Sequence, residues 1–385
     1  CQQWIHEIGM PTEPDTHEVF FQGGTIVATT SGGDTLVGRF MGENDWNAGA
    51  QDKLYREECA PGWEYPFTIL FTKEIYIEAS HLSPPNHFKW FWWEIAKLVK
   101  FFKPGAPEDY QRIVIKYIKV KRQDPPGWWP DLTPFTNYEN TYIGLAMDLD
   151  APYDTSGGPE PNVGDESACN YAGYDATNEI AYVTGFGRAG EHPEYLDYHA
   201  GIALAEVNAA VQTTPYATAN IKNNVYLYPQ SPWGWLDGEL YQLASTPGNY
   251  IQDPDSIVDR SVVLTAHKIV AGDDPNMEAG FTLVEVLAPT GVAEMQALVA
   301  TARDIVAAER AKCGDVQSDL VVNVGDVVYL VSYLYKGGPA PDCPQARGDV
   351  NTDGVINVGD VVYLVSYLYK GGPEPACPDL VWGWR

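Results

Sequence analysis

The side chains best suited to chemistry in this chain are oxygen donors grouped in one segment, GDVNTDGVINVGD, residues 348–360. Counted from Asp349, carboxylate or amide oxygens fall at positions 1, 3, 5, 9 and 12, and a backbone carbonyl is expected at position 7. Hard cations such as calcium take about six to eight oxygens, and Gly354 at position 6 permits the sharp turn that gathers them. The segment therefore predicts a calcium site. Its donors are Asp349, Asn351, Asp353, Val355, Asn357 and Asp360.

The same pattern occurs a second time, 34 residues upstream, and the segment NVGDVVYLVSYLYKGGP follows both loops in identical form. Such a period indicates a duplicated supersecondary unit. In the first copy Gln317 replaces the short amide and Leu320 replaces the glycine, so we expect weaker calcium binding there. The predicted donors of this loop are Asp315, Gln317, Asp319, Val321, Asn323 and Asp326.

A helix is predicted after each loop, because apolar residues recur at the i, i+3, i+4, i+7 spacing and a Lys-Gly-Gly-Pro sequence ends the run. Loop and helix together make half of an EF-hand, used twice. With these features residues 313–385 resemble the type I dockerin family. The resemblance implies a calcium-dependent fold that binds cohesin modules through loop positions 10 and 11. Those positions hold Val324 and Gly325, and Val358 and Gly359, where the best-known relatives carry hydroxyl residues.

The six cysteines are an even number without a C-x-x-C pair, which favours disulfides in an oxidising compartment over metal ligation. We therefore expect an extracellular or cell-surface protein whose leader has been removed before Cys1. Whether Cys1 is acylated or simply begins a mature chain stays open. The dockerin resemblance implies that the two halves pack antiparallel, which favours a bridge between Cys313 and Cys377.

Residues 1–312 contain many short runs rich in β-branched and aromatic residues, separated by Gly, Pro, Asn and Asp. The pattern predicts a mainly β fold, an antiparallel β-sandwich-like body with two amphipathic helices. We predict a first β-rich domain over 1–135 with an inserted helix over 87–103. A second sandwich-like domain is predicted over 136–312, ending in a helix over 290–312, followed by the helical dockerin-like module over 313–385.

The predicted helix over 87–103 is basic in an acidic chain. It is expected to lie on a sheet with solvated lysines, and the alternatives are a contact with an acidic neighbouring subunit or with a membrane surface. No Pro/Thr-rich or Gly/Ser linker separates the helix over 290–312 from the module, which favours a rigid junction over a flexible tether.

Other polar groups give weaker signals. The carboxylates between Asp148 and Glu166 suggest a solvated acidic loop, with a second calcium site or a glycosidase pair as alternatives. The cluster EHPEYLDYH, residues 191–199, lacks a metal-ligand spacing, and GFGRAG, residues 185–190, lacks the apolar helix that a dinucleotide site needs. Paired tryptophans at 233 and 235 and at 382 and 384 could be buried, or could stack on sugars or bind proteins.

The net charge of −28 argues against nucleic acid as a partner, and no apolar run is long enough for a transmembrane segment. We interpret the chain as a secreted, non-catalytic calcium-binding structural or interaction protein that assembles with a protein partner. The partner is a second copy of the chain or a cohesin-type module, and polysaccharide is a further candidate. The alternative is a carbohydrate-active enzyme or carbohydrate-binding protein attached to a complex through its dockerin.

Overall fold

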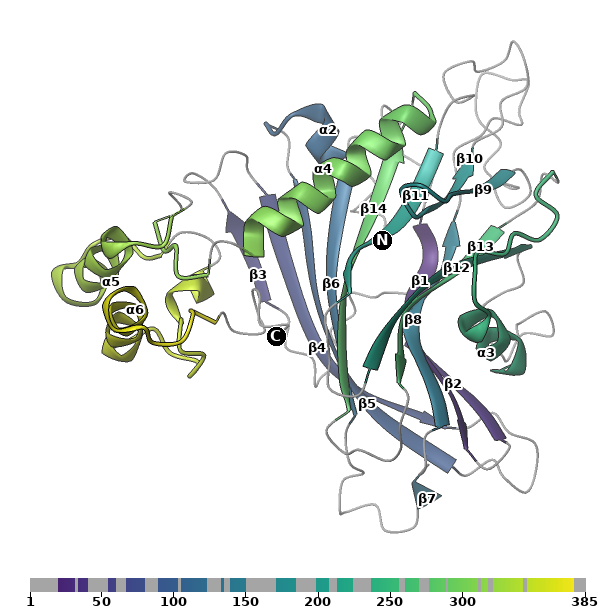
Figure 1. The fold of residues 1–385 in the computed structure, drawn as a ribbon, viewed down its shortest axis with the longest axis horizontal. Helices are drawn as coiled ribbons and strands as arrows, with labels where there is room; N and C mark the ends of the chain where they lie inside the picture. Colours follow the sequence, from purple (N-terminus) through teal and green to yellow (C-terminus); the bar gives the residue numbers. More distant parts are fainter. Residues whose placement is uncertain are drawn as a thin grey trace.

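The computed structural model describes residues 20–31, 34–40, 55–59, 67–79, 89–102, 105–122, 133–134, 139–149, 171–184, 199–207, 213–223, 237–255, 260–269, 277–288, 290–310, 313–317, 321–341 and 345–376. These residues form a body of two antiparallel sheets and a small helical module near the C-terminal end of the sequence (Figure 1). The predicted mainly β fold class with a helical C-terminal module is confirmed.

The smaller sheet has five antiparallel strands in the order β12, β13, β8, β1, β2. A short helix, α3 (Asp237–Ser245), packs on the face of this sheet that points away from the body's centre. The strands are β1 (Phe20–Ser31), β2 (Asp34–Phe40), β8 (Glu139–Leu149), β12 (Thr213–Asn223) and β13 (Arg260–Ile269).

The larger sheet runs in the order β3, β4, β5, β6, β14, β11, β10, β9, with all these neighbours antiparallel. Its strands are β3 (Tyr55–Cys59), β4 (Phe67–Ala79), β5 (Lys89–Phe102), β6 (Ile113–Arg122), β9 (Tyr171–Asp175), β10 (Ile180–Thr184), β11 (His199–Val207) and β14 (Glu278–Ala288). The two-residue strand β7 (Thr133–Pro134) pairs with β5 in parallel.

The two sheets share one hydrophobic core. Val27 of β1 and Leu145 of β8 lie in the same buried cluster as Trp93 of β5 and Phe281 of β14. Both sheets combine strands from before and after residue 135, because β1 pairs with β8 and β6 pairs with β14. The segments predicted as separate β-rich domains therefore contribute to a common sandwich.

The helix predicted over residues 87–103 is wrong, because Lys89–Phe102 form strand β5 between β4 and β6. Both faces of β5 are buried: Val99 lies in the core between the sheets, and Phe102 lies in a second cluster on the outer face. A strand covered on both sides has no alternation of polar and apolar residues, so its apolar positions also match a helical spacing. Two lysines expected to be solvated are buried as well, Lys97 and Lys100.

Helix α4 (Val292–Arg310) covers the outer face of the larger sheet across β14, β11 and β6 and corresponds to the helix predicted over 290–312 (Figure 1). It buries Met295 and Val299 against that face. None of the helices in the described part of the chain is long and apolar enough to cross a membrane.

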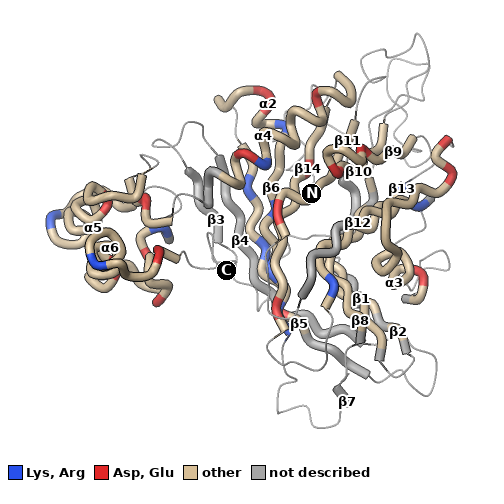
Figure 2. Tube along the Cα trace, in the orientation of Figure 1, with Lys and Arg blue, Asp and Glu red and all other residues tan. Residues whose placement is uncertain are grey.

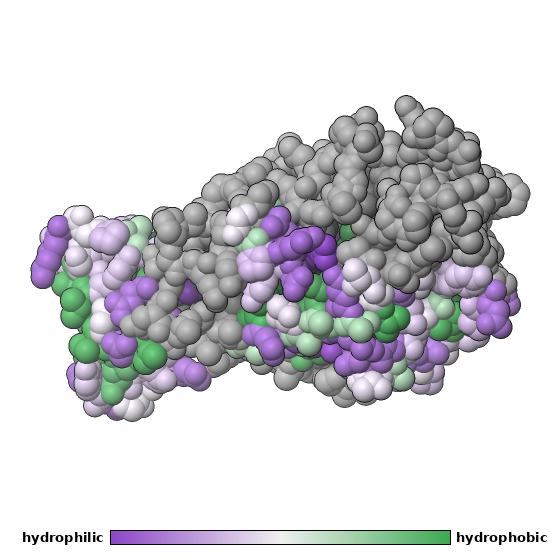
Figure 3. Space-filling model, turned by 90° about the horizontal axis from the view of Figure 1, so that it is seen from above, coloured by the Kyte–Doolittle hydropathy of each residue, from purple (hydrophilic) through white to green (hydrophobic). Residues whose placement is uncertain are grey.

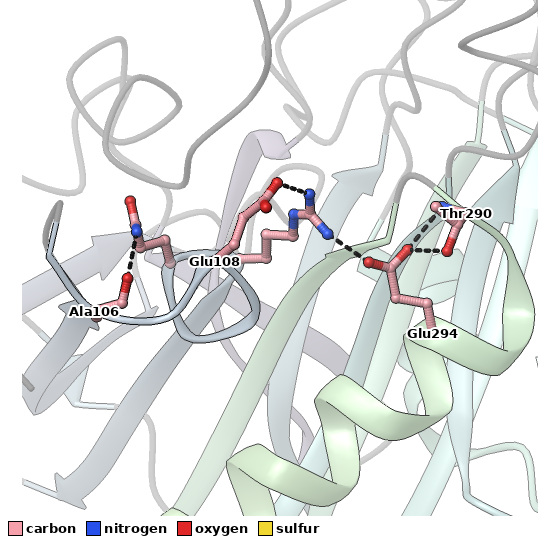
Figure 4. A network of polar contacts seen from close by, with 6 residues as sticks. Ala106, Glu108, Thr290 and Glu294 are labelled. Atoms are coloured by element: carbon pink, nitrogen blue, oxygen red, sulfur yellow. Dashed lines mark hydrogen bonds and ion pairs between the residues drawn. The ribbon is translucent and has the colours of Figure 1, made fainter. Parts of the chain in front are cut away.

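The N-terminal end of α4 is fixed to the edge of the body by a charged network (Figure 4). The carboxylate of Glu294 accepts hydrogen bonds from the backbone N–H and the hydroxyl of Thr290, both at 2.7 Å. Its other oxygen accepts from Arg112 at 2.5 Å, and Arg112 also donates to Glu108 in the short helix α2 (Glu108–Gln111). This network connects α4 to the segment between β5 and β6.

The middle of α4 is held by Arg303, whose guanidinium is half buried. It donates to the backbone carbonyl of Leu204 from two nitrogens, at 2.9 and 3.2 Å, and to the carbonyl of Asn178 at 2.8 Å. About two turns earlier, Gln296 donates to the carboxylate of Asp175 at 2.7 Å. These contacts fix α4 to the β9–β10 turn and to the bulge of β11.

The C-terminal module contains helix α5 (Val324–Lys336), a 3-10 turn η3 (Gln345–Gly348) and helix α6 (Val358–Lys370). The identical sequences of α5 and α6 give identical ends. Both begin with a capping box, formed in α5 by Asn323 and Asp326, and both end at a glycine in the left-handed region. The module's core holds four buried apolar side chains among the described residues, Val316, Leu330, Val350 and Leu364.

Candidate metal centre

The second predicted loop is placed between the turn η3 and helix α6, so that its first donor follows the turn and its last two belong to the helix cap. Gly354 has φ +87° and no heavy atom within 4 Å of where a Cβ would stand. Glycine is therefore required there by the backbone conformation and not by crowding. The loop turns at the position predicted from the spacing.

The carboxylate of Asp349 lies inside this turn and is 3 % exposed. It accepts hydrogen bonds from the backbone N–H groups of Asp353 at 3.0 Å and Gly354 at 2.8 Å. The carboxylate of Asp353 in turn accepts from the Val355 N–H at 3.0 Å and from the Asn351 amide at 2.9 Å. The loop is thus wound around its own oxygen-bearing side chains.

The acid at the end of the loop, Asp360, is fully buried and accepts hydrogen bonds from the backbone N–H of Asn357 at 2.8 Å and of Asn351 at 3.3 Å. Burial raises the pKa of its carboxyl, and the charge of Asp349 raises it further. The pKa of the exposed Asp353 is instead lowered, chiefly by the hydrogen bond from Asn351. A divalent cation in this loop would neutralise the repulsion between the two buried acids.

The first loop repeats this arrangement where it is described. Asp315 and Asp326 are both fully buried, and Asp326 accepts from the backbone N–H of Val316 at 2.8 Å and of Asn323 at 2.7 Å. Burial raises the pKa of Asp326 to about 6, with a contribution from the charge of Asp315. Asp319 and Leu320 lie outside the described residues.

The amide at loop position 3 lies against the start of the following helix in both copies. A Cβ on Gly325 would stand 2.6 Å from the amide nitrogen of Gln317, and a Cβ on Gly359 would stand 3.0 Å from that of Asn351. The glycines at position 11, identified from the resemblance as recognition residues, therefore allow close packing inside the module, and a Cβ there would displace the side-chain amide of position 3. Only position 10 presents a large side chain, and Val324 there is 52 % exposed.

The donor set fits a hard cation. Across the described residues, no group of three or more His, Cys, Asp or Glu side chains is arranged to hold a metal ion. The predicted second loop differs from such a cluster, because half of its donors are amide or backbone oxygens. A set of charged carboxylate oxygens together with neutral amide and carbonyl oxygens suits calcium and not a transition metal.

Two further residues of the module occupy equivalent positions in the repeat, two residues before the first donor of each loop. Cys313 takes part in a disulfide, and its predicted partner Cys377 lies outside the described residues, so that pairing stays a prediction. Its counterpart Arg347, in η3, is fully buried. The sequence did not predict a role for Arg347, although the repeat aligns it with Cys313.

The other predicted polar groups lie almost entirely outside the described residues. This holds for the carboxylates from Asp150 to Glu166, for the whole GFGRAG motif (residues 185–190), and for the tryptophans at 233, 235, 382 and 384. Of the cluster over 191–199 only His199 is described. It is buried in β11, and its ring centroid lies 5.7 Å from that of Tyr182.

Comparison with known families agrees with this geometry. Residues 313–369 match the family model described as the type I dockerin domain, and no curated protein matches the chain. The predicted dockerin resemblance is confirmed over these residues. Type I dockerin domains bind calcium through EF-hand-like loops, so the prediction of calcium as the cofactor is confirmed too.

Proposed function

We propose that this protein is a secreted, non-catalytic structural or interaction protein whose dockerin module docks a protein partner when calcium is bound. The type I dockerin match carries this proposal, because such modules imply calcium-dependent docking to a protein of the cohesin type. The observed loop agrees with it, since its buried acids and amide oxygens are wound around one turn. Dockerin proteins typically lie outside the cell or on its surface, which supports the proposed location.

The ligands proposed for the second site are Asp349, Asn351, Asp353, Asn357, Asp360 and the carbonyl of Val355. The corresponding set of the first site begins with Asp315 and ends with Asp326. Both sets join their loop to the cap of the following helix, because the position-9 asparagine caps the helix and the position-12 aspartate completes the capping box. Calcium binding would therefore stabilise the helices as well as the loops.

The β-sandwich is proposed to be the unit that the module assembles or displays. Helix α4 supports this role, because its contacts to Arg112 and to the carbonyls of Asn178 and Leu204 fix it along the larger sheet. The helix ends at Arg310 and the module begins at Cys313, so the connection is short. A rigid connection suits an architectural protein better than a catalytic domain on a flexible tether.

The deciding experiment is light scattering of the full chain in calcium and in excess chelator, alone and with a cohesin module. Calcium-dependent complexes, with itself or with the cohesin, are the expected result. A chain that binds no calcium by titration calorimetry would contradict the proposal. A parallel polysaccharide binding and hydrolysis screen tests the alternative, a carbohydrate-active protein on a dockerin, and calcium-independent hydrolysis would favour it.

A further inference from the structure

The turn that follows helix α3 contains an aspartate in an unusual backbone conformation directly before a proline. Asp253 has φ +45° and is followed by Pro254. Aspartate tolerates a positive φ better than most residues with a Cβ, but the residue before a proline is normally held in an extended backbone. The fold therefore keeps Asp253 in a conformation that an Asp–Pro sequence does not favour by itself.

The residues just before Asp253 are fixed to strand β12. The backbone N–H of Ile221 donates to the carbonyl of Tyr250 at 2.7 Å, and the N–H of Gln252 donates to the carbonyl of Ile221 at 2.9 Å. The fully buried side chain of Asn220 accepts from the N–H of Tyr250 at 2.9 Å. Because this segment is anchored up to Gln252, the backbone that enters Asp253 has a defined position.

The carbonyl of Asp253 is held from inside by Arg260, the first residue of β13, which is fully buried. Its Nη2 donates to the carbonyl oxygen of Asp253 at 2.9 Å, and its Nη1 donates to that of Gln252 at 2.5 Å. Burial lowers the pKa of Arg260 and the charge of Asp253 partly offsets this, so the carboxylate acts on the same guanidinium. A fixed cation on a carbonyl oxygen stabilises negative charge that develops there.

The outer side of the same turn is open to water. Asp253, Pro254 and Asp255 are all exposed. In Figure 2 the turn beyond α3 runs along the outside of the body and carries acidic positions, drawn in red. Figure 3 shows hydrophilic surface at this end of the body, away from the C-terminal module. The Asp253 carbonyl is thus held by a buried cation on one side and lies in a water-exposed turn.

We propose that the Asp253–Pro254 bond is a self-cleavage site, at which the Asp253 carboxyl attacks its own main-chain carbonyl while Arg260 binds the carbonyl oxygen. The new bond between carboxyl oxygen and carbonyl carbon closes a five-membered anhydride ring. The C–N bond to Pro254 breaks, and the carboxyl proton goes to the proline nitrogen. Water then adds to the anhydride and restores two carboxyl groups on residue 253, so water is the only co-reactant.

The chain offers its own reference for this reaction, because it contains three Asp–Pro bonds. The other two are Asp124–Pro125 and Asp274–Pro275, which lie outside the described residues. In all three the leaving nitrogen belongs to a tertiary amide, which takes up a proton more readily than an ordinary peptide nitrogen does. The dipeptide alone therefore gives the three bonds a similar lability, and acceleration by Arg260 is expected at one of them.

Cleavage at this bond nicks the body without separating its parts. Residues 1–253 contain the strands up to β12, and residues 254–385 contain β13, β14, α4 and the calcium-binding module. Strand β13 lies between β12 and β8, and β14 lies between β6 and β11, so each sheet combines strands from both fragments. The two fragments are therefore expected to stay associated. This reaction does not depend on the proposed docking function.

The test is a time course of the full, calcium-loaded chain in mildly acidic buffer, folded and in urea, followed by mass spectrometry after reduction of disulfides. In the folded chain we expect fragments 1–253 and 254–385, formed about tenfold or more faster than in urea. The other two Asp–Pro bonds should not gain in this way. The rate should be independent of protein concentration, and the nicked protein should elute as the intact chain does in native size-exclusion chromatography.

Two variants and a matched control assign the roles. Asp253→Asn removes the attacking carboxyl and should abolish the fast cleavage, and Arg260→Lys keeps the charge without the two-pronged contact and should slow it about tenfold or more. Asp255→Asn changes the neighbouring exposed acid and should leave the rate unchanged. Thermal melting checks folding, and Asp253→Asn decides alone if Arg260→Lys does not fold. A folded chain that cleaves at this bond no faster than the chain in urea overturns the proposal, as does a wild-type rate in either folded variant.

Discussion

The sandwich body and the C-terminal module are stabilised by different means. The body's main cluster contains large side chains from both sheets, among them Trp93 of the larger sheet and Leu264 of the smaller, which are almost fully buried. The module's cluster has four fully buried apolar residues in its described part, beside four buried aspartates. Burial of apolar area stabilises the first region without help, whereas so small a core cannot offset four buried acids. From this difference we expect calcium to be part of the module's fold and not an addition to it.

Removal of calcium should separate the two regions most clearly. With excess chelator we expect α5 and α6 to lose their hydrogen-exchange protection, because Asp349 and Asp360 are then left close together without a cation. The strands of the body should keep their protection, since their core contains no such acid cluster in its described part. Hydrogen exchange with and without chelator measures both regions in one sample. Equal protection of the module in both conditions would contradict a calcium-dependent fold.

Loss of the α4 anchor should affect the body alone. Arg303→Ala removes three hydrogen bonds to the carbonyls of Leu204 and Asn178, and we expect it to lower the body's free energy of unfolding by about 2–3 kcal/mol. Arg303→Lys is the matched control, because it keeps the charge but cannot reach both carbonyls with a planar fork. Urea unfolding followed by tryptophan fluorescence gives the value, and calcium affinity should not change. A change below about 0.5 kcal/mol would mean that the anchor is replaced by water.

The sequence predicted the module far better than the body, for a physical reason. The calcium loop is defined by residues within 12 positions of one another, so that the place of Gly354 and of Asn357 could be found from spacing alone. Strand pairing is not local, because β1 pairs with β8, more than 100 residues away. Nothing in the sequence of either strand indicates which strand is its partner. The error at β5 has the same origin, because burial on both faces depends on α4 and on the opposite sheet.

Within the module, the repeat spacing placed the glycines at 325 and 359 at position 11 of each loop, but it did not indicate why glycine stands there. The resemblance suggested a role in partner recognition, whereas in the structure a side-chain amide lies 2.6 Å from the position of a Cβ on Gly325 and 3.0 Å from that of a Cβ on Gly359. That contact joins positions 3 and 11 of each loop. It becomes visible only once the loop has been folded, so no pattern of residue types could have predicted it.

The two loops differ at position 6, where the first has Leu320 and the second has Gly354. Substitution at this position should make their calcium affinities similar. Gly354→Leu places a side chain at φ +87°, which costs about 1–2 kcal/mol in backbone strain and should weaken calcium binding at the second loop. Leu320→Gly is the reverse change, and we expect it to strengthen binding at the first loop. Titration calorimetry should then show two similar sites in the Leu320→Gly chain and two weak sites in the Gly354→Leu chain. Unchanged isotherms would mean that position 6 does not distinguish the loops.

Acid should weaken the body in a way that is unrelated to the calcium loops. His267 is fully buried in β13, and its Nε2 lies 2.6 Å from the backbone carbonyl of Gly280 in the opposite sheet, while its Nδ1 has no hydrogen-bond partner among the described atoms. Burial lowers the pKa of this imidazole, so the unfolded chain takes up a proton at a higher pH than the folded chain. The stabilisation is therefore complete above about pH 6.5 and is lost as the pH falls through the folded-state pKa, by at most about 1.4 kcal/mol per pH unit.

His267→Gln tests this dependence, because glutamine keeps an N–H donor for the Gly280 carbonyl but does not titrate. The difference between the body's free energies of unfolding at pH 7.5 and pH 5.5 should be smaller in the variant than in the wild type. Both measurements are made in chelator, so that protonation of the calcium-binding acids does not affect the body's transition. An equal pH dependence in the two proteins would assign the acid sensitivity to another group and would show that His267 can be protonated without disturbing the contact between the sheets.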